Sequence, residues 1–252
     1  MDSYRFLSAY YDRFTDDVGY DRWADYFEQV FARCGFRPAL VLDLACGTGT
    51  LTGEMARRGY EMIGADRSEE MLAQAQEKMM EEEEPFPIQP IFLHQSMEKL
   101  DLYGTIDACV CCLDSVNYVT RPELLARAFR RVHLFLMPGG LFIFDVNTPE
   151  KLWGLDGQVF LDETEDAYCV WRAEYSPRRR ICTYAMDVFR HTGGDLWERG
   201  TELHEEYAYE PQQLEEMLRQ AGFGHIKQYG ERKMRPPKAG EERIFFVARK
   251  EF

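Results

Sequence analysis

Three residues in one short stretch could do chemistry together: the carboxylate Asp43 and the glycines Gly47 and Gly49. The apolar run 39–44 around the acid is typical of a buried parallel strand, and residues 51–58 have a helical pattern. Glycines in the turn between them let the backbone bend sharply and let a ligand approach without a Cβ atom in the way. A strand, a glycine turn and a helix N-terminus predict a ligand site at the carboxyl edge of an open α/β sheet.

Two carboxylates narrow the choice of ligand. Asp43 ends the first strand, where an acid suits a positively charged ligand such as an ammonium or a sulfonium group. Asp66 ends a second apolar stretch, 60–65, at the position from which a carboxylate binds ribose hydroxyls. The dinucleotide fingerprint requires a third glycine where this chain has Thr52. The pattern therefore favours a cationic nucleoside ligand, and a Rossmann-like turn for some other nucleotide is the alternative.

The amino-acid composition limits which classes of protein and partner are compatible with the chain. The 252 residues are 45% hydrophobic and 14% aromatic, which is typical of a globular chain. The formal net charge of −14 works against a nucleic-acid partner, because affinity for phosphate backbones comes mainly from clustered Lys and Arg. The seven cysteines show no paired metal spacing and are expected as reduced thiols. With no signal peptide and no apolar run near the ~20 residues of a membrane span, we expect a cytoplasmic monomer or homodimer with no membrane or metal partner.

The elements that must position this site follow from the hydrophobic pattern. The N-terminal segment is rich in aromatic residues, with helical spacing at Trp23, Phe27 and Phe31. Further strands are expected at 91–94, 106–112, 141–147, 226–229 and 244–249, and further helices from Ser68 onward and at 122–136 and 211–220. The alternation of strands and helices predicts an α/β fold with a mostly parallel sheet, whose last strand is antiparallel.

From about Gln158 the periodicity changes to that of strands. Alternating residues rich in Tyr, Val, Trp and Thr cover 166–175, 180–190 and 196–209. This predicts a three- or four-stranded antiparallel insert. In its last strand four polar residues share one face by the two-residue period, namely Glu198, Glu202, His204 and Glu206. We expect Glu198 and Glu206 to face solvent.

The motif Asp43-x-x-Cys46-Gly47-x-Gly49, followed by Asp66, resembles motif I and the acidic loop of the class I S-adenosylmethionine (SAM) dependent methyltransferases. The Leu-x-Pro-Gly-Gly segment at 136–140 is similar to a further mark of that superfamily. With the order of elements and the insert, the chain resembles the small-molecule branch, which includes glycine N-methyltransferase-like enzymes and aminosugar N,N-dimethyltransferases.

The resemblance implies an organisation into three parts. Residues 37–150 and 210–252 would form a Rossmann-like SAM-binding domain with a seven-stranded sheet and helices on both faces. Residues 1–36 would form a helical lid over the SAM pocket, and residues 157–209 would form the antiparallel insert that covers the acceptor site.

The resemblance also implies SAM as cofactor, S-adenosylhomocysteine as product, and a set of contacts. Related enzymes place Gln-Asp-Met against the adenine, and here the Asp position is Ser96, whose hydroxyl can still hydrogen-bond the base. The cofactor-binding positions that it implies are Tyr11, Tyr20, Trp23, Asp43, Ala45, Cys46, Gly47, Gly49, Asp66, Arg67, Ser68, Met71, Gln95, Ser96, Met97, Leu113 and Asp114.

The acceptor site is expected between the loop 114–118 and the insert. Its candidate substrate-contacting residues are Asn117, Tyr118, Trp171 and His204. An amine must lose a proton before it attacks, so His204 or Tyr11 would be the catalytic base, and a structural role for His204 on the outer face of the sheet is the alternative. An aromatic pocket with an acidic rim favours a small amine, because π faces and carboxylates hold cations.

We therefore expect a SAM-dependent methyltransferase that acts on a small-molecule acceptor, at an amine nitrogen. The chain lacks the Asn/Asp-Pro-Pro-Tyr/Phe motif of DNA amino methylation and any Pro-Cys dipeptide of cytosine C5 methylation. A tRNA or protein methyltransferase, and a SAM-binding protein without transferase activity, remain the alternatives.

Overall fold

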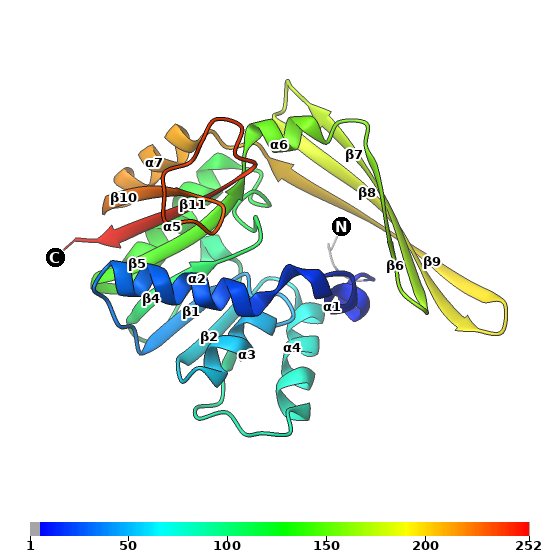
Figure 1. Ribbon diagram of the computed structural model, residues 1–252, viewed down its shortest axis with the longest axis horizontal. Helices are drawn as coiled ribbons and strands as arrows, with labels where there is room; N and C mark the ends of the chain where they lie inside the picture. The colour runs from blue at the N-terminus through cyan, green and yellow to red at the C-terminus, as the bar shows by residue number, and fades with distance from the viewer. Residues whose placement is uncertain (1–5, 252) are drawn as a thin grey trace.

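The computed structural model describes residues 6–251, which form an α/β body and a smaller antiparallel sheet that projects from it (Figure 1). Within these residues the body holds a seven-stranded sheet in the order β10-β11-β5-β4-β1-β2-β3. Its strands are β1 (Leu40–Leu44), β2 (Glu61–Asp66), β3 (Ile91–His94), β4 (Ile106–Cys111), β5 (Leu136–Asn147), β10 (Phe223–Gly230) and β11 (Arg243–Lys250). Strand β11 is antiparallel to both of its neighbours, whereas the pairs among β1 to β5 are parallel. The predicted sheet is confirmed.

Helices cover both faces of this sheet. The long helices are α2 (Tyr20–Arg33), α3 (Thr50–Arg57), α4 (Glu69–Glu81), α5 (Pro122–Phe135) and α7 (Pro211–Gln220). Strand β5 shows why both faces are apolar: Phe142 and Phe144 pack in the core with α5 and α7, whereas Leu141 and Ile143 pack in the core with α2 and α3. Successive side chains of a strand point to opposite faces, so a doubly covered strand reads as a continuous apolar run.

The projecting sheet has the order β6-β7-β8-β9, and every pairing in it is antiparallel. Its strands are β6 (Val159–Glu163), β7 (Ala167–Ser176), β8 (Ile181–Gly193) and β9 (Leu196–Tyr207), and the short helix α6 (Pro149–Gly154) leads into it. The structure therefore has four strands where the sequence predicted three or four. The additional strand β6 precedes the alternating segments on which the prediction was based.

The N-terminal segment, residues 6–18, lies between the body and the projecting sheet (Figure 1). It contains three short helices, η1 (Ser8–Tyr10), α1 (Tyr11–Phe14) and η2 (Asp16–Val18). Leu7 is buried against Val188 of β8. On the other side, the Asp12 carboxylate pairs with the Lys78 ammonium of α4 at 2.5 Å and accepts a hydrogen bond from the Thr48 hydroxyl at 2.5 Å. The segment is therefore attached to both sheets.

The loops after β1 and β4 meet at the point where the strand order reverses. From β1 the chain builds outward through β2 and β3, and from β4 it builds in the opposite direction through β5. In open α/β sheets this reversal leaves a crevice at the carboxyl ends of the strands, where ligands bind. Among the described residues, no helix is long and apolar enough to cross a membrane.

Candidate functional site

A cavity of about 290 Å³ lies at this crevice. Its lining comes from the N-terminal segment, the start of α2, the loops after β1, β2, β3 and β4, and the start of α5. The lining residues are Tyr11, Tyr20, Asp43, Ala45, Cys46, Gly47, Leu51, Asp66, Arg67, Met71, Gln95, Ser96, Met97, Glu98, Cys112, Leu113, Ser115, Tyr118, Val119, Thr120, Arg121 and Leu124. Most of the positions named from the sequence as SAM contacts line it; Trp23, Gly49, Ser68 and Asp114 do not.

Asp43 is a buried acid on the wall of this cavity, with 2% of its surface exposed. The pKa of its carboxyl is raised to about 7, chiefly by burial and also by the nearby Asp66 charge, while the Thr52 hydrogen bond acts to lower it. The Thr52 hydroxyl donates that bond to Asp43 Oδ2 at 2.6 Å. This explains the absence of a third glycine: Thr52 supports the acid. A carboxylate with few donors around it is suited to a cationic ligand group.

Asp66 holds the glycine turn in place. Its Oδ2 accepts a hydrogen bond from the Gly47 backbone N–H at 2.9 Å, and its Oδ1 accepts one from the Ser68 N–H at 2.8 Å. Burial still raises the pKa of the Asp66 carboxyl, against these two bonds. Gly47 has φ of +54°, and a Cβ built on it would meet no atom within 4 Å, so the space beside it is open to the cavity that it lines.

Gly49, by contrast, serves packing. A Cβ on this residue would lie 3.0 Å from Ala75 and Phe92, so the glycine allows the turn to approach α4 and β3 closely. Ser68 caps α4, because its hydroxyl accepts a hydrogen bond from the Met71 N–H. These two residues therefore shape the loops around the cavity from outside it.

The loop after β3 brings an acid that the sequence analysis missed. Gln95 is occupied within its own loop, since its side chain bonds both the N–H and the carbonyl of Asp101. The Ser96 hydroxyl donates a hydrogen bond to Glu98 Oε1 at 2.8 Å, and both residues line the cavity. The only indication of this acid in the sequence was its position, two residues after Ser96. In the structure Glu98 lies in the short helix η3 (Met97–Lys99).

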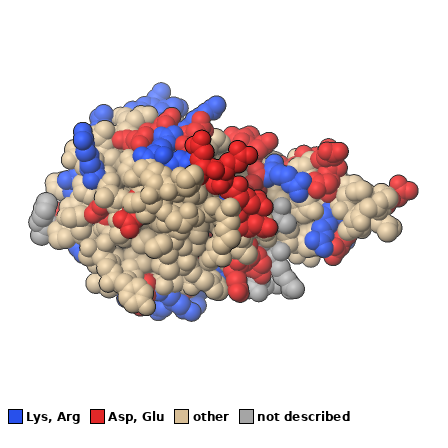
Figure 2. Space-filling model, turned by 90° about the horizontal axis from the view of Figure 1, so that it is seen from below, with Lys and Arg blue, Asp and Glu red and all other residues tan. Residues whose placement is uncertain are grey.

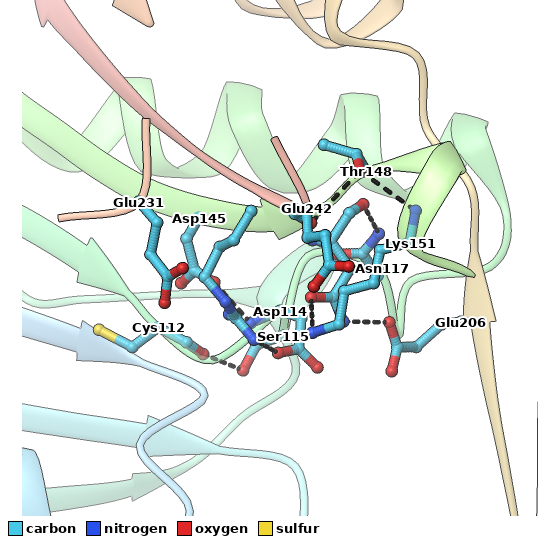
Figure 3. Close-up of polar contacts among 12 residues, drawn as sticks. Cys112, Asp114, Ser115, Asn117, Asp145, Thr148, Lys151, Glu206, Glu231 and Glu242 are labelled. Carbon is cyan, nitrogen blue, oxygen red and sulfur yellow. Dashed lines mark hydrogen bonds and ion pairs between the residues drawn. The ribbon is translucent and has the colours of Figure 1, made fainter. Parts of the chain in front are cut away.

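The loop after β4 has a strained backbone at the cavity. Leu113 and Asp114 both have positive φ, 55° and 54°, which is uncommon for residues other than glycine and is concentrated at functional sites. An ion-pair cluster supports this conformation: the Arg243 guanidinium pairs with Asp114 at 2.7 Å and with Asp145, and the Asp114 N–H donates to Asp145 Oδ2 at 3.0 Å. Figure 3 shows Asp114 and Asp145 in this cluster. Asp114 therefore holds the loop.

Asn117 fastens the loop to both sheets. Its side-chain amide donates hydrogen bonds to the carbonyls of Asn147 and Tyr207, and its Oδ1 accepts one from the Asn147 N–H. It is fully buried and does not line the cavity. Trp171, the candidate from the insert, stacks on Phe160 with ring centroids 4.3 Å apart and is also absent from the cavity lining.

Tyr118 lines the cavity and leads to His204. The Tyr118 hydroxyl lies 3.3 Å from His204 Nδ1, and His204 Nε2 lies 2.9 Å from Glu202 Oε2. His204 is 1% exposed, so it does not face solvent, and it does not itself line the cavity. The structure joins the loop after β4 to β9 through these side chains.

Glu206 and Glu198 differ sharply, although they share a strand face. Glu198 is exposed and pairs with Arg190, as expected. Glu206 is 3% exposed and accepts a hydrogen bond from the Asn147 side chain at 2.9 Å, so the expectation that it faces solvent was wrong (Figure 3). Burial, with the negative charge of Asp114, raises the pKa of Glu206 to about 8. The face of β9 that carries both residues is therefore exposed to solvent at Glu198 and buried against the body at Glu206.

Two of the three aromatic residues proposed from the N-terminal region line the cavity. Tyr11 and Tyr20 do so, and burial raises the pKa of both hydroxyls well above the usual range. Trp23 is 3% exposed and packs in the core, with its ring centroid 5.3 Å from that of Phe245. Within the described part of the chain, no group of three or more His, Cys, Asp or Glu side chains could hold a metal ion.

The sheet order, the glycine turn and the acids after β1 and β2 define a class I methyltransferase fold with its ligand cavity. Comparison with known proteins agrees. Residues 41–140 match the family described as "Methyltransferase domain". The chain is 32% identical over 249 residues to "Putative methyltransferase YqeM" of Bacillus subtilis (strain 168), covering 98% of this chain and 97% of that protein.

Solved structures agree as well. A SAM-dependent methyltransferase from Clostridium acetobutylicum ATCC 824 has a TM-score of 0.86 at 26% identity, with 98% of each chain covered. The sugar N-methyltransferase KedS8 from Streptoalloteichus sp ATCC 53650 shares the fold, with a TM-score of 0.79 at 20% identity, 100% of this chain and 96% of that chain covered. The chain belongs to the family of SAM-dependent methyltransferases that includes YqeM.

Proposed function

We propose that this methyltransferase transfers the methyl group of SAM to the amine nitrogen of a small molecule. One observation carries the choice of acceptor: Tyr118 lines the cavity, and its hydroxyl lies 3.3 Å from Nδ1 of the buried His204. An amine arrives as an ammonium ion at neutral pH and needs a proton acceptor before it can attack. The sugar N-methyltransferase of the same fold supports this class of acceptor.

The cavity fits SAM by the chemistry of its walls. The ribose hydroxyls would bind Asp66, and the cationic methionine end would lie near Asp43 and Gly47. The adenine edge would lie at residues 95–98. There the Glu98 carboxylate would accept a hydrogen bond from the exocyclic amino group of the base, and it is a stronger acceptor than the Ser96 hydroxyl alone. Bound SAM would supply a methyl group on a sulfonium, which is already a good leaving group.

The protein's part in the reaction is to position the partners and exclude water. Residues 1–36 would act as the lid through Tyr11 and Tyr20, residues 37–150 and 210–252 would bind SAM, and residues 157–209 would roof the acceptor. Burial raises the pKa of Tyr11, so its hydroxyl stays protonated at neutral pH and suits a donor rather than the base.

The acidic surface argues against a tRNA acceptor. Figure 2 shows Asp and Glu side chains gathered in a band across the middle of one face, where α4 lies in Figure 1. This helix carries Glu69, Glu70, Glu77 and Glu81. A phosphate backbone would be repelled there, because its affinity depends on clustered cations. The acceptor screen described next also distinguishes a protein acceptor and a protein that binds SAM without turnover.

The test is formation of S-adenosylhomocysteine from SAM with paired acceptors. Each amine, such as glycine, glucosamine or another amino sugar, is paired with the analogue in which a hydroxyl replaces the amine, and unmodified tRNA and a mixed peptide pool are run beside them. We expect turnover with members of the amine set only. Turnover with the hydroxyl analogues, tRNA or peptides would assign a different acceptor. SAM binding without turnover of any class would contradict the proposal.

A further inference from the structure

One face of the projecting sheet is covered by no helix or strand among the described residues (Figure 1). The N-terminal segment packs on the other face, where Leu7 lies with Val188 in a small apolar cluster. Side chains of opposite parity along the four strands point away from that cluster, to the outer face. Large apolar side chains on the outer face are well exposed: Val159 at 63%, Leu161 at 53% and Leu203 at 47%. An exposed apolar surface of this kind is typical of a protein–protein contact.

The pairing of the strands arranges the outer face in three rows, each of which begins on β6 and ends on β9. The first row is Val159, Arg172, Ala185 and Leu203, the second is Leu161, Val170, Asp187 and Thr201, and the third is Glu163, Tyr168, Phe189 and Arg199. The two ends of the first row are therefore both apolar, and the two ends of the third row carry opposite charges.

The charged side chains on this face leave positive charge exposed. Asp187 pairs with both Arg172, at 2.6 Å, and Arg199, at 2.5 Å. One carboxylate thus serves two guanidiniums, and the two arginine side chains are 48% and 58% exposed while that of Asp187 is 10% exposed. Arginine presents five N–H donors, so Arg199 can accommodate a second carboxylate without giving up Asp187.

We propose that the outer face is the interface of a two-fold symmetric dimer, in which the projecting sheet of one copy packs on that of a second copy. A two-fold axis parallel to the strands, between β7 and β8, lays each row on the same row of the second copy with its ends exchanged. Val159 then faces Leu203 of the second copy, and Glu163 faces Arg199 of the second copy. Each contact occurs twice, because a two-fold interface is isologous.

The charge pattern selects this axis over the other one in the plane of the interface. A two-fold axis running across the strands would reverse the order of the rows. It would place Glu163 on Val159 of the second copy and Arg199 on Leu203 of the second copy, and charges buried against apolar groups are costly. Only the axis parallel to the strands matches apolar ends with apolar ends and acid with base.

The size of the face is sufficient for a specific interface. Four strands about 4.8 Å apart, with about eight paired residues at about 3.4 Å each, present roughly 500 Å². Two copies packed face to face, about 10 Å apart as in a β-sandwich, would bury about 1,000 Å² in total. This is the lower end of the range for specific complexes, so we expect a dimer that dissociates on dilution. The proposal concerns assembly, goes beyond the proposed function and does not depend on the methyl acceptor.

The test is sedimentation equilibrium of the full chain, at total concentrations from about 1 to about 100 µM, the range in which an interface of this size should form. We expect a monomer–dimer equilibrium for the wild type. Glu163→Arg alone and Arg199→Glu alone should each weaken the dimer about 10-fold or more, because like charges would then face each other twice. An equal mixture of the two variants should recover the dimer, since each contact in the mixed pair joins an acid and an arginine.

The matched control is Glu165→Arg, an exposed acid in the turn between β6 and β7, which should leave the equilibrium unchanged. Leu203→Asp should weaken the dimer about 100-fold, because it places a charge in the apolar part of the interface. Circular dichroism and SAM titration show that each variant is folded. If Leu203→Asp does not fold, the two charge variants and their mixture still decide the result.

Several outcomes would overturn the proposal. A wild type that stays monomeric throughout this range has no such interface. A dimer that Glu163→Arg leaves intact uses another face of the molecule, and a mixture that stays dissociated excludes the two-fold pairing of Glu163 with Arg199. Assemblies larger than a dimer would indicate a head-to-tail contact, because a two-fold interface is complete with two copies. None of these results bears on methyl transfer, so this proposal and the proposed function fail separately.

Discussion

The Asp66 carboxylate accepts a hydrogen bond from the Gly47 backbone N–H at 2.9 Å, which ties the end of β2 to the turn after β1. The acid proposed to bind the ribose therefore also shapes the glycine turn beside it. One oxygen is used for Gly47 and the other for the Ser68 N–H. The Arg67 backbone also hydrogen-bonds this carboxylate. Because a carboxylate has about four lone-pair sites, it can still accept a hydrogen bond from a ligand hydroxyl.

This double role makes a prediction for Asp66. Asp66→Ala should cost about 2–3 kcal/mol of SAM binding, because the ribose hydroxyls lose a charged partner and the turn loses its support. Asp66→Asn keeps one acceptor oxygen and should lose less. Calorimetric titration with SAM measures both, with the exposed Asp101→Ala as control. Unchanged affinity in Asp66→Ala would remove Asp66 from the site.

Asp43 makes SAM binding depend on pH. Its carboxyl has a pKa raised to about 7 by burial, and only the ionised form attracts the cationic ligand. Affinity should therefore rise, roughly eightfold, as pH increases from about 6 to about 7.5. Thr52→Val removes the hydroxyl that stabilises the ionised form, so it should move this rise to higher pH. A rise that Asp43→Asn leaves unchanged would assign the effect to another group.

Glu98 should contribute to adenine binding together with Ser96. Glu98→Gln should weaken SAM binding by about 1–2 kcal/mol, because a neutral amide accepts more weakly than a carboxylate. Ser96→Asp should also weaken it, since a second carboxylate would stand at hydrogen-bond distance from the first. Combining both substitutions should recover affinity. If Ser96→Asp alone binds SAM more tightly, Ser96 itself faces the base.

Glu206 should destabilise the fold increasingly as pH rises. Its pKa is raised to about 8, so between about pH 5 and 8 the unfolded chain is ionised at this residue while the folded protein keeps the proton. Glu206→Gln removes this cost and should raise the free energy of unfolding at pH 8, by at most about 1.4 kcal/mol per pH unit across the window. A higher thermal midpoint at pH 8 would report this gain. The gain should shrink toward pH 5, and a gain independent of pH would argue against the buried acid. Glu205→Gln serves as the control, because Glu205 is only half-buried and pairs with Arg179.

The sequence by itself determined the layers of the fold and the cofactor half of the site. Strands covered on both faces must be continuously apolar, so runs such as 141–147 could be recognised without the structure. The glycine turn and its acids depend on local spacing along one strand–turn–helix unit. Asp43, Gly47 and Asp66 were therefore found from their own neighbourhoods, and all three line the cavity.

Only the tertiary structure decided which side of a patterned element meets the ligand. Helical spacing relates Tyr20 to Trp23 but does not say that the first lines the cavity and the second packs on Phe245. A period of two placed Glu198 and Glu206 on one face, yet only the docking of β9 on the body buries the second. Tyr118 and His204 meet across 86 residues of sequence, because the loop after β4 lies against β9 there, and no local pattern encodes that contact.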